Sequence, residues 1–522
     1  MDADARPDAD VLVVGGGPVG LFLAGELGLA GASVLVVEKL DRNGRPDSPA
    51  LRGVTTRTMR TLALRGLDRP IVEAAEQALR TLIGTAATLA PARARGSEAP
   101  GQVASTKLGN GGATKGHIAM VPLTDPAGEH SDVSLLPVPY AALREVFAER
   151  ARQHGVRLTH GRGVVALESE PGGVAARLDD GRTVRARYLV GADGGRSTVR
   201  RLAGFDFPGT EPTLFAVGGE DVTLVGPERL PRGFTRTPVG ALMVDVVPGQ
   251  VVALEFDRPP ADRHAPATAR ELQAALRRVS GVEVTVARVR SPFRYNDNAR
   301  QAVSYRRDRI LLAGDAAHVH SPFGGQGVNL GVQDAANLGW KLARVVRGTA
   351  PSRLLDTYTA ERHAPAARVL RNSRAQAALL RHGPQIDAVR ELIADLAEVP
   401  QAKRMLIEML HALDVTYDHG RPAGHPLVGR FAPDLLAPDG PAVFEDGRAV
   451  LLDATPAAEH RPAVVGRPDV RWARTGFPDH PALAAVLVRP DGYVAWAGDG
   501  ADARPRLAEA LDDWFGRPSA TS

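Results

Sequence analysis

The sequence predicts an α/β protein in which a Rossmann-like nucleotide-binding domain is combined with an antiparallel sheet and a small C-terminal domain. Three observations predict it. A strand, a glycine-rich turn, a helix and a second strand follow one another near the N-terminus. Apolar and polar residues alternate over Gly240–Phe256, as in paired antiparallel strands. After about residue 415 the long helical patterns give way to short strands and loops.

The composition is that of an ordinary globular protein. The 522 residues are 44% hydrophobic and 24% charged, with a net charge of +4. Five of the 64 basic residues are lysines, and neither a block of like charges nor an excess of aromatic residues indicates a nucleic-acid surface. The chain has no cysteine, which excludes disulfides, iron–sulfur ligation and thiolate zinc sites and fits a reducing cytoplasm.

The N-terminal region predicts neither a signal peptide nor a membrane span. The first ten residues, MDADARPDAD, are acidic and polar. Between Val11 and Val37 the only charged residue is Glu26, but GGGPVG interrupts the stretch and Glu26 would lie inside the bilayer. A buried strand, turn and helix explains the pattern better, so we expect a cytoplasmic protein without membrane contact.

The first glycine motif predicts a dinucleotide-binding site. The strand Val11–Val14 runs into GGGPVG, in which Gly15, Gly17 and Gly20 match G-x-G-x-x-G. The three glycines permit a tight turn, close approach of the backbone to a pyrophosphate, and close packing of helix on strand. The N–H groups at the start of the following helix attract the phosphates. The motif residues assigned to the cofactor are Gly15, Gly17, Pro18, Val19 and Gly20.

The next strand ends in an acid that selects among dinucleotides. SVLVVE places Glu38 18 residues after Gly20, where a carboxylate accepts hydrogen bonds from both ribose hydroxyls of an adenosine. It disfavours a 2′-phosphate, so FAD or NAD(H) fits better than NADP(H). Lys39 follows and is assigned to the same site. From this motif alone, a glycine-rich turn that holds no ligand stays open as the alternative.

Two further strands end in acids followed by glycines. In RYLVGADGGRSTVRR a strand ends at Asp193, and the alternative is that Asp193 only caps the next helix. In RILLAGDAAHVHSPFGGQGVNLGVQDAANLGWKL the strand Ile310–Ala313 leads to Asp315, then to a glycine turn and a long helix. The chain therefore carries three strand-end acids that are far apart in sequence.

Together the three motifs resemble those of the group A flavoprotein aromatic hydroxylases, which share the para-hydroxybenzoate hydroxylase fold. That family carries G-x-G-x-x-G, then D-G, here Asp193-Gly194, then G-D, here Gly314-Asp315. The chain is most similar to the aromatic polyketide hydroxylases of antibiotic pathways and, more loosely, to the rifampicin monooxygenases. The strongest pieces are LAGELGLAGASVLVVEK, YLVGADGGRSTVRRLAGFDFPGT and GDAAHVHSPFGGQGVNLGVQDAANLGWKLARVVRG.

The resemblance implies a fold and roles for single residues. The fold is a Rossmann-like FAD-binding domain with an antiparallel-sheet substrate domain and a thioredoxin-like C-terminal domain. Asp315 would bind the FAD ribitol, and Asp193 with Gly194 would serve both FAD and the nicotinamide cofactor. Arg52, in ALRGVTTRTM, would lie beside the isoalloxazine. Tyr140 stands where the family often has a glutamine that reaches the flavin.

The glycine turn of the third motif is expected to lie against the flavin ring. Pro322 fixes the direction of the turn, and Gly324, Gly325 and Gly327 let the backbone approach. The helix that begins near Val328–Asn329 would point its N–H groups at the pyrimidine edge, where they stabilise negative charge.

Other cofactor chemistries are not indicated. His318 and His320 suggest a metal, but no third ligand is near in sequence, so packing or capping is the better interpretation and no metal site is expected. A second G-x-G-x-x-G and a cysteine pair, as in flavin disulfide reductases, are both missing. The tryptophans are isolated, whereas a flavin-dependent tryptophan halogenase would show a Trp-x-Trp pair.

By resemblance, the chain is expected to be a single-component FAD monooxygenase that uses NADPH or NADH and O2. A flavin C4a-hydroperoxide would hydroxylate a polycyclic aromatic polyketide or related antibiotic. The alternatives are Baeyer–Villiger oxygenation of a similar substrate, a hydroxylase that inactivates an antibiotic, and an inactive flavin-binding scaffold. We expect a small-molecule aromatic substrate, no nucleic-acid or membrane partner, and a monomer or homodimer.

The predicted domains are interleaved along the chain. The FAD-binding domain comprises 8–75, 120–205 and 295–375, and the substrate-binding domain 76–119 and 206–294, with a mobile insertion at Thr85–Gly116. A helical connector, 376–414, precedes the C-terminal domain, 415–522, which we expect to be structural or oligomerising and dispensable for FAD binding. No residue is assigned as a substrate base. The pocket candidates, for which core packing is the alternative, are Phe234, Met243, Phe256, Phe293 and Phe323.

Overall fold

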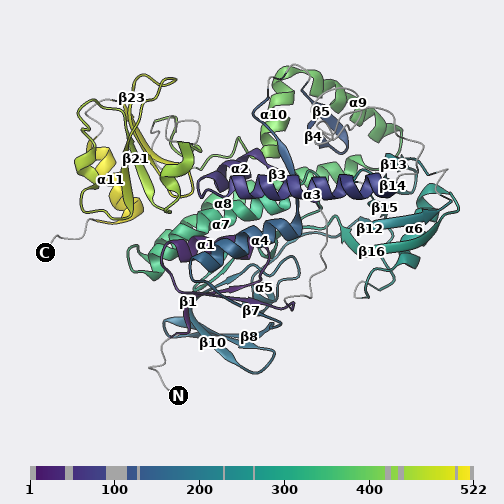
Figure 1. The fold of residues 1–522 in the computed structure, drawn as a ribbon, viewed down its shortest axis with the longest axis horizontal. Helices are drawn as coiled ribbons and strands as arrows, with labels where there is room; N and C mark the ends of the chain where they lie inside the picture. The colour runs from purple at the N-terminus through teal and green to yellow at the C-terminus, as the bar shows by residue number, and fades with distance from the viewer. Residues whose placement is uncertain are drawn as a thin grey trace.

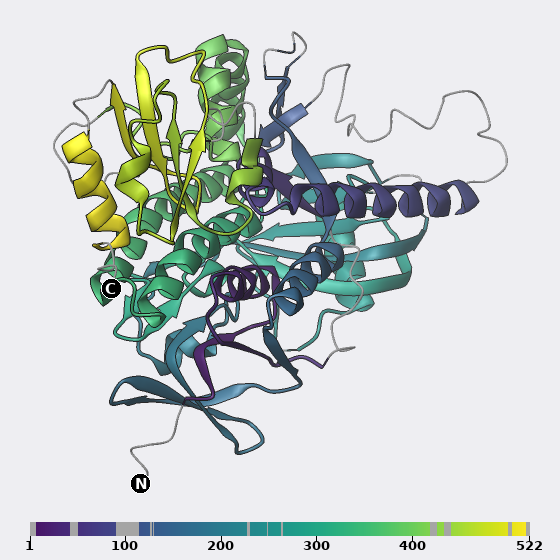
Figure 2. The same cartoon turned by 60° about the vertical axis from the view of Figure 1, so that its left-hand side comes forward.

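Two long helices run through the middle of the molecule between two small sheets. In the computed structural model, α7 (Gly327–Val346) and α8 (Asp356–Leu379) lie between the C-terminal sheet and an antiparallel sheet at the opposite end (Figure 1). Figure 2 shows the nucleotide-binding sheet below these helices. The structure describes residues 7–41, 51–89, 114–125, 128, 130–226, 230–247, 249–262, 265–417, 425–432, 440–499 and 504–517.

The first motif lies on an eight-stranded sheet whose central strands are parallel. The strand order is β18-β19-β10-β1-β2-β7, and the antiparallel β8 and β9 continue from β10. Central strands such as VLVV are apolar throughout because both faces of a parallel sheet are covered. The strands are β1 (Ala9–Val14), β2 (Val34–Glu38), β7 (Arg157–His160), β8 (Val164–Glu170), β9 (Gly173–Leu178), β10 (Thr183–Gly191), β18 (Arg306–Arg307) and β19 (Ile310–Leu312).

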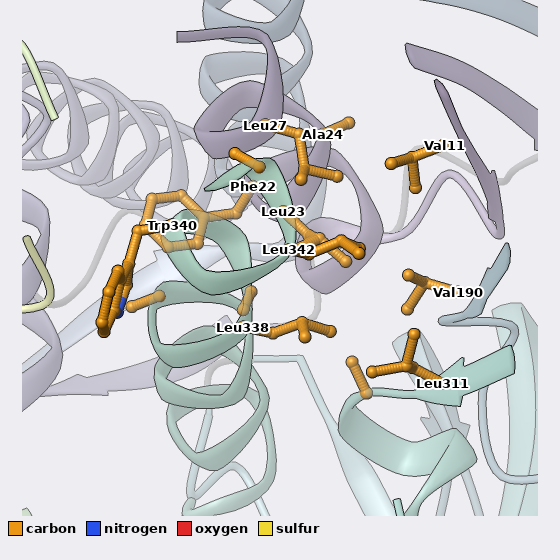
Figure 3. Packing of buried hydrophobic residues seen from close by; sticks show 14 of the residues in the cluster. Val11, Phe22, Leu23, Ala24, Leu27, Val190, Leu311, Leu338, Trp340 and Leu342 are labelled. Atoms are coloured by element: carbon orange, nitrogen blue, oxygen red, sulfur yellow. The ribbon is translucent and has the colours of Figure 1, made fainter. Parts of the chain in front are cut away.

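The main core forms where α1 (Pro18–Leu29) and α7 pack on this sheet. Figure 3 shows Leu338 and Leu342 on the side of α7 that faces Val190 and Leu311, with Trp340 on the opposite side. The two helices approach closely at Gly339, where a Cβ would lie only 2.6 Å from the Cβ of Glu26. This contact lets α1 and α7 pack side by side on the sheet.

The predicted antiparallel sheet is present. Its order is β13-β14-β15-β12-β16, and α6 covers one of its faces. The alternating stretch Gly240–Phe256 forms two of its strands. The elements are β12 (Leu214–Val225), β13 (Gly233–Thr237), β14 (Gly240–Val244), β15 (Val251–Phe256), β16 (Thr285–Asn296) and α6 (Ala269–Ser280).

Smaller elements connect the two sheets. The strands are β3 (Leu51–Thr55) paired with β6 (Leu135–Pro139), β4 (Thr114–Ile118) paired with β5 (Val121–Thr124), and the three-stranded β11 (Gly209–Thr210), β17 (Ala299–Gln301) and β20 (His318–Val319). The helices are α2 (Thr56–Ala63), α3 (Asp68–Leu89), α4 (Tyr140–Gln153), α5 (Thr198–Leu202), α9 (Pro384–Glu398) and α10 (Pro400–His411). Most of the predicted insertion Thr85–Gly116 lies outside the described residues. No helix in the described part of the chain has the length and apolar character needed to cross a membrane.

The C-terminal part has the strand arrangement expected of a thioredoxin-like domain. The order is β22-β21-β23-β24, in which β21 and β22 are parallel and the other neighbours antiparallel. The predicted hairpin forms β23 and β24. The elements are β21 (Ala449–Asp453), β22 (Val470–Arg474), β23 (Leu483–Val488), β24 (Val494–Asp499) and α11 (Arg504–Phe515).

Buried ion pairs join this C-terminal part to α7 and α8. Arg489, at the tip of the β23–β24 hairpin, is fully buried and donates to both carboxylate oxygens of Glu361 at 2.6 and 2.9 Å. Lys341 of α7 donates to the same Glu361 at 2.7 Å. The Arg489 guanidinium also lies 4.7 Å from the ring centre of Trp514. The hairpin is therefore part of the core of the molecule.

Candidate cofactor and substrate site

The three strand-end acids lie along one edge of the nucleotide-binding sheet. Val14 of β1 is level with Val37 of β2 and with Gly191 of β10. Gly191 is in turn level with Leu312 of β19. Glu38, Asp193 and Asp315, which follow these positions, therefore gather at the carboxyl ends of the strands. Ligands of open α/β sheets bind at this edge.

Two glycines of the first motif are required by packing. Gly15 has a φ of +115°, and a Cβ there would lie 2.3 Å from the carbonyl oxygen of Ala192. A Cβ on Gly20 would lie 2.0 Å from the carbonyl oxygen of Gly15. Gly17 caps α1 and Pro18 begins it, so no side chain caps the first N–H groups of the helix. Such a helix start is suited to an anionic ligand.

Glu38 is held rigidly beside this turn. It is buried, and its Oε2 accepts a hydrogen bond from the N–H of Gly16 at 2.6 Å. Its Oε1 accepts from the N–H of Leu40 at 2.9 Å. Lys39 is exposed, and Val19 packs against Gly314 and Gly331. The carboxylate of Glu38 is thus fixed at the end of β2, as a ribose-binding acid requires.

Asp193 acts within the protein as a helix cap. Its carboxylate accepts hydrogen bonds from the N–H groups of Thr198 at 2.6 Å and Val199 at 3.0 Å, and from the Ser197 hydroxyl. The structure therefore shows the capping role, and the expected role of Asp193 at FAD and the nicotinamide cofactor stays a prediction. The neighbouring Gly194 has a φ of +79°, and no atom of the described residues lies within 4 Å of a Cβ built on it. The space beside Gly194 is therefore open.

Asp315 differs from Asp193 because its carboxylate is exposed. Among the described residues it has no hydrogen-bond or ion-pair partner. It follows Gly314, which has a φ of +61° and packs on Val19 of the first motif. Of the three strand-end acids, Asp315 is the one whose carboxylate projects away from the protein. That placement fits a residue that binds a ligand directly.

The glycine turn leaves open space at its centre. Gly325 has a φ of +64°, and a Cβ there would meet no atom of the described residues within 4 Å. Its N–H donates to the carbonyl of Pro322, which is exposed. The helix begins at Gly327, slightly earlier than predicted, and Val328 packs on the core. The space beside Gly325 is therefore open to a ligand.

Hydrogen bonds of Asn329 connect the glycine turn to β3. Its Nδ2 donates to the carbonyls of Gly53 at 2.7 Å and Gly325 at 2.8 Å. Its Oδ1 accepts from the N–H of Thr55 at 2.9 Å. The side-chain amide of Asn329 is occupied by these protein bonds, and its predicted contact with the cofactor stays a prediction.

Arg52 and Tyr140 lie together beside the turn. Arg52 is exposed on β3, which Asn329 holds next to Gly325. Its guanidinium carbon is 5.5 Å from the centre of the Tyr140 ring, at the start of α4. The structure thus brings together the arginine and the residue that departs from the family pattern.

The five predicted pocket residues lie in one apolar cluster on the face of the antiparallel sheet opposite α6. The cluster contains Phe234, Met243, Phe256, Phe293 and Phe323. Tyr295, which was not predicted, joins them: its ring centre is 6.3 Å from that of Phe293 and 6.5 Å from that of Phe323. Burial raises the pKa of Tyr295, so its hydroxyl stays protonated. Because Phe323 belongs to the glycine turn, the aromatic face and the turn adjoin.

Sequence reasoning missed the residues that connect the motifs. Arg200 donates to the carbonyls of Gly195 and Ala316, both at 2.9 Å, and thereby ties the second motif to the third. His318 is buried, with its Nε2 2.6 Å from Asp334. No three His, Asp or Glu side chains of the described residues converge as metal ligands. Arg200 stands beside other arginines, and Asp334 is the one acid of α7, but neither belongs to a motif that predicts its distant partners.

The comparisons with known proteins agree with this geometry. An FAD binding domain family matches residues 8–373, and an aromatic-ring hydroxylase C-terminal family matches residues 425–518. The chain is 39% identical to a 12-dehydrotetracycline 5-monooxygenase/anhydrotetracycline 6-monooxygenase of Streptomyces rimosus, over 98% of this chain and 99% of that protein.

Two further comparisons cover nearly the whole chain. It is 39% identical to a rifampicin monooxygenase of Streptomyces venezuelae, over 98% of this chain and 99% of that protein. The solved structure of an anhydrotetracycline hydroxylase from Streptomyces rimosus superposes with a TM-score of 0.81 at 36% identity, covering 98% of this chain and 100% of that one. The resemblance expected from the three motifs is confirmed: the chain binds FAD and belongs to the family of FAD-dependent aromatic-ring hydroxylases.

Proposed function

We propose that this flavin monooxygenase uses NADPH or NADH and O2 to hydroxylate a polycyclic aromatic polyketide or a related antibiotic. The observation that carries the proposal is the meeting of two surfaces. The strand-end edge with the open glycine turn fits FAD, and an aromatic-lined sheet face adjoins that turn through Phe323.

The residues at the strand ends suit the separate parts of FAD. The turn at Gly15 and the start of α1 would hold the pyrophosphate, and Glu38 the adenosine ribose. Asp315 would accept from the ribitol hydroxyls, and the open turn at Gly325 would lie along the ring. When bound, FAD supplies the hydride and oxygen chemistry, and the protein supplies placement.

The aromatic face would orient the substrate and keep water away. Phe293, Tyr295 and Phe323 present ring faces and edges that suit a flat polycyclic molecule. Exclusion of water protects reactive oxygen chemistry from side reactions. Two of the similar proteins are named for tetracycline-type substrates and one for rifampicin. These names support a polycyclic substrate.

The test is product analysis with labelled oxygen. Purified protein is heated to release its cofactor, which should be FAD. The protein is then incubated with NADPH or NADH, 18O2 and a panel of anthraquinone, naphthacene and ansamycin substrates. One 18O atom in a product that resists mild base supports hydroxylation, whereas a product that base opens as an ester supports Baeyer–Villiger oxygenation. Products without 18O from every substrate that reacts would contradict the proposal.

A further inference from the structure

A buried carboxylate inside α7 holds the backbone of the third motif. Asp334 is fully buried, in the second turn of the helix that begins at the glycine turn. Its Oδ2 accepts a hydrogen bond from the N–H of Gly314 at 3.1 Å and lies 2.6 Å from Nε2 of His318. Asp334 therefore contacts the chain on both sides of Asp315, the acid expected to bind the ribitol.

A cationic side chain of α8 balances the negative charge of Asp334. Its Oδ1 accepts a hydrogen bond from Nε of Arg362 at 2.8 Å, and Arg362 is also fully buried. Burial by itself would raise the pKa of Asp334, but His318 and Arg362 outweigh that effect and hold the pKa below its usual range. The carboxylate is thus charged and can accept from three donor groups at once.

Arg362 is held in turn by a residue at the start of the predicted C-terminal domain. Its Nη1 donates to the hydroxyl of Tyr417 at 3.3 Å, and its Nη2 to the carbonyl of Leu330 at 3.3 Å. The Tyr417 ring stacks on Tyr493 of the C-terminal hairpin, with ring centres 3.9 Å apart. A continuous path of buried contacts therefore runs from the hairpin to the N–H of Gly314.

We propose that Asp334 is a positioning residue that holds the Gly314–Asp315 turn in the conformation that binds FAD, and that Tyr417 extends this control through Arg362 toward the C-terminal domain. The inference rests on the proposed role of Asp315 at the ribitol. A packing role alone does not require an acid here, because an apolar side chain fills a core position at lower desolvation cost than a buried ion pair.

The neighbouring network around Glu361 provides a matched control. Glu361 is also a buried carboxylate with cationic partners, Lys341 and Arg489. None of its hydrogen bonds described above reaches the three motifs. A carboxylate-to-amide change at either position removes one charge and one acceptor oxygen, since an amide nitrogen cannot accept a hydrogen bond.

The first experiment compares Asp334→Asn with Glu361→Gln. Apoprotein is titrated with FAD to obtain the Kd, and its melting temperature is recorded without FAD. We expect both variants to melt at lower temperature, while only Asp334→Asn raises the FAD Kd, by at least tenfold. Hydrogen–deuterium exchange of the apoprotein should show faster exchange at the Gly314 amide in Asp334→Asn alone. Equal Kd values and equal exchange in the two variants would overturn the role of Asp334.

The second experiment uses two stacked tyrosines. The Tyr417 hydroxyl bonds Arg362, whereas the Tyr493 hydroxyl is buried without a partner among the described residues. Tyr417→Phe should raise the FAD Kd about threefold or more, and Tyr493→Phe should leave it unchanged. The same Kd in both variants would overturn the extension to Tyr417. If Asp315→Ala also binds FAD as tightly as wild type, the proposed ribitol site itself is wrong, which separates that failure from the failure of this inference.

Discussion

At the residue scale, Asp193 and Asp315 carry the same group at the ends of neighbouring strands but face different surroundings. The carboxylate of Asp193 accepts hydrogen bonds from Ser197, Thr198 and Val199. That of Asp315 is exposed and, among the described residues, has no partner. One acid therefore stabilises the protein and the other is available to a ligand.

This contrast predicts opposite effects of two alanine substitutions. Asp315→Ala should weaken FAD binding by about 1–3 kcal/mol, because ribitol hydroxyls lose their acceptor. It should leave the apoprotein's unfolding free energy within about 0.5 kcal/mol of wild type. Asp193→Ala should instead lower that unfolding free energy by about 1 kcal/mol through loss of the cap. FAD titration and urea denaturation of the apoproteins measure both quantities. Matching changes in the two variants would show that the assignments are wrong.

Gly325→Val tests whether the glycine turn lies against the flavin. The position has a positive φ, which costs an L-residue about 1–2 kcal/mol, and the new side chain would enter the open space. We expect weaker FAD binding or a higher ratio of H2O2 released to NAD(P)H consumed. Gly172→Val is the control, because Gly172 also has a positive φ and open space but lies in the β8–β9 turn. Normal FAD binding and coupling in Gly325→Val would refute the placement.

Sequence patterns predict contacts between residues that are close together in sequence, but not contacts between residues that are far apart in sequence. The contact of Gly20 with the Gly15 carbonyl follows from motif spacing, because it lies within one strand–turn–helix unit, whereas the contact of Gly15 with Ala192 joins segments that are far apart in sequence. The same holds for Asn329: its amide bonds Gly53 and Thr55, which are distant in sequence. Asp334 is likewise a single acid in a helical pattern, and only the fold brings Gly314, His318 and Arg362 to its carboxylate.

At the element scale, the β23–β24 hairpin is inserted into the body of the protein. Its Arg489 and Asp491 are buried, and Arg489 pairs with Glu361 of α8. Sequence reasoning expected the chain after about Thr416 to be dispensable for FAD binding but required for solubility or assembly. The ion pair between Arg489 and Glu361 joins residues that are far apart in sequence, so no local sequence pattern predicts it. With the structure, we expect a chain truncated after Thr416 to be insoluble.

The hairpin contact is tested by Arg489→Ala. The variant leaves the Glu361 carboxylate without its bidentate partner, which should lower the unfolding free energy by about 3–5 kcal/mol. Arg504→Ala is the control, because Arg504 is more than half exposed and its contact with Glu459 is a surface pair. Denaturant unfolding monitored by tryptophan fluorescence gives both values. A loss for Arg489→Ala no larger than that for Arg504→Ala would show that the hairpin is not a core element.

The strands of the sheets differ in how clearly a sequence pattern predicts them. The pattern over Gly240–Phe256 predicts β14 and β15 because successive side chains of a strand point to opposite faces of the sheet. The two-residue strands β18 and β20 are too short to leave a pattern and exist only because longer neighbours pair with them.

At the scale of the whole molecule, buried histidines make stability depend on pH. Burial lowers the pKa of His117, His154, His320, His363 and His411 below the ordinary value of 6.5. As pH falls through 6.5, the unfolded chain binds protons at these sites before the folded chain does. Stability linked to these groups is therefore present above pH 6.5 and is lost below it.

We expect the melting temperature to fall steadily from about pH 6.5 to pH 5. Thermal unfolding by circular dichroism at constant ionic strength measures the slope. His117→Asn keeps an acceptor for the N–H of Met120. This variant should have a shallower slope, because at most one proton fewer is taken up on unfolding. A melting temperature that stays constant or rises over this range would contradict the prediction.

The strand order of the nucleotide-binding sheet also governs when the protein can acquire its cofactor. The central strand β10 pairs with β1 on one side and with β19 on the other. A ribosome that has released residues 1–300 has made the first two motifs but not β19 or the glycine turn. Until β19 emerges, only the last part of β10, Leu189–Gly191, lacks a partner on that side, because β9 already pairs with its first part. The FAD site can therefore be complete only after β19 and the glycine turn have been synthesised, so we expect nascent chains shorter than about 330 residues not to bind FAD.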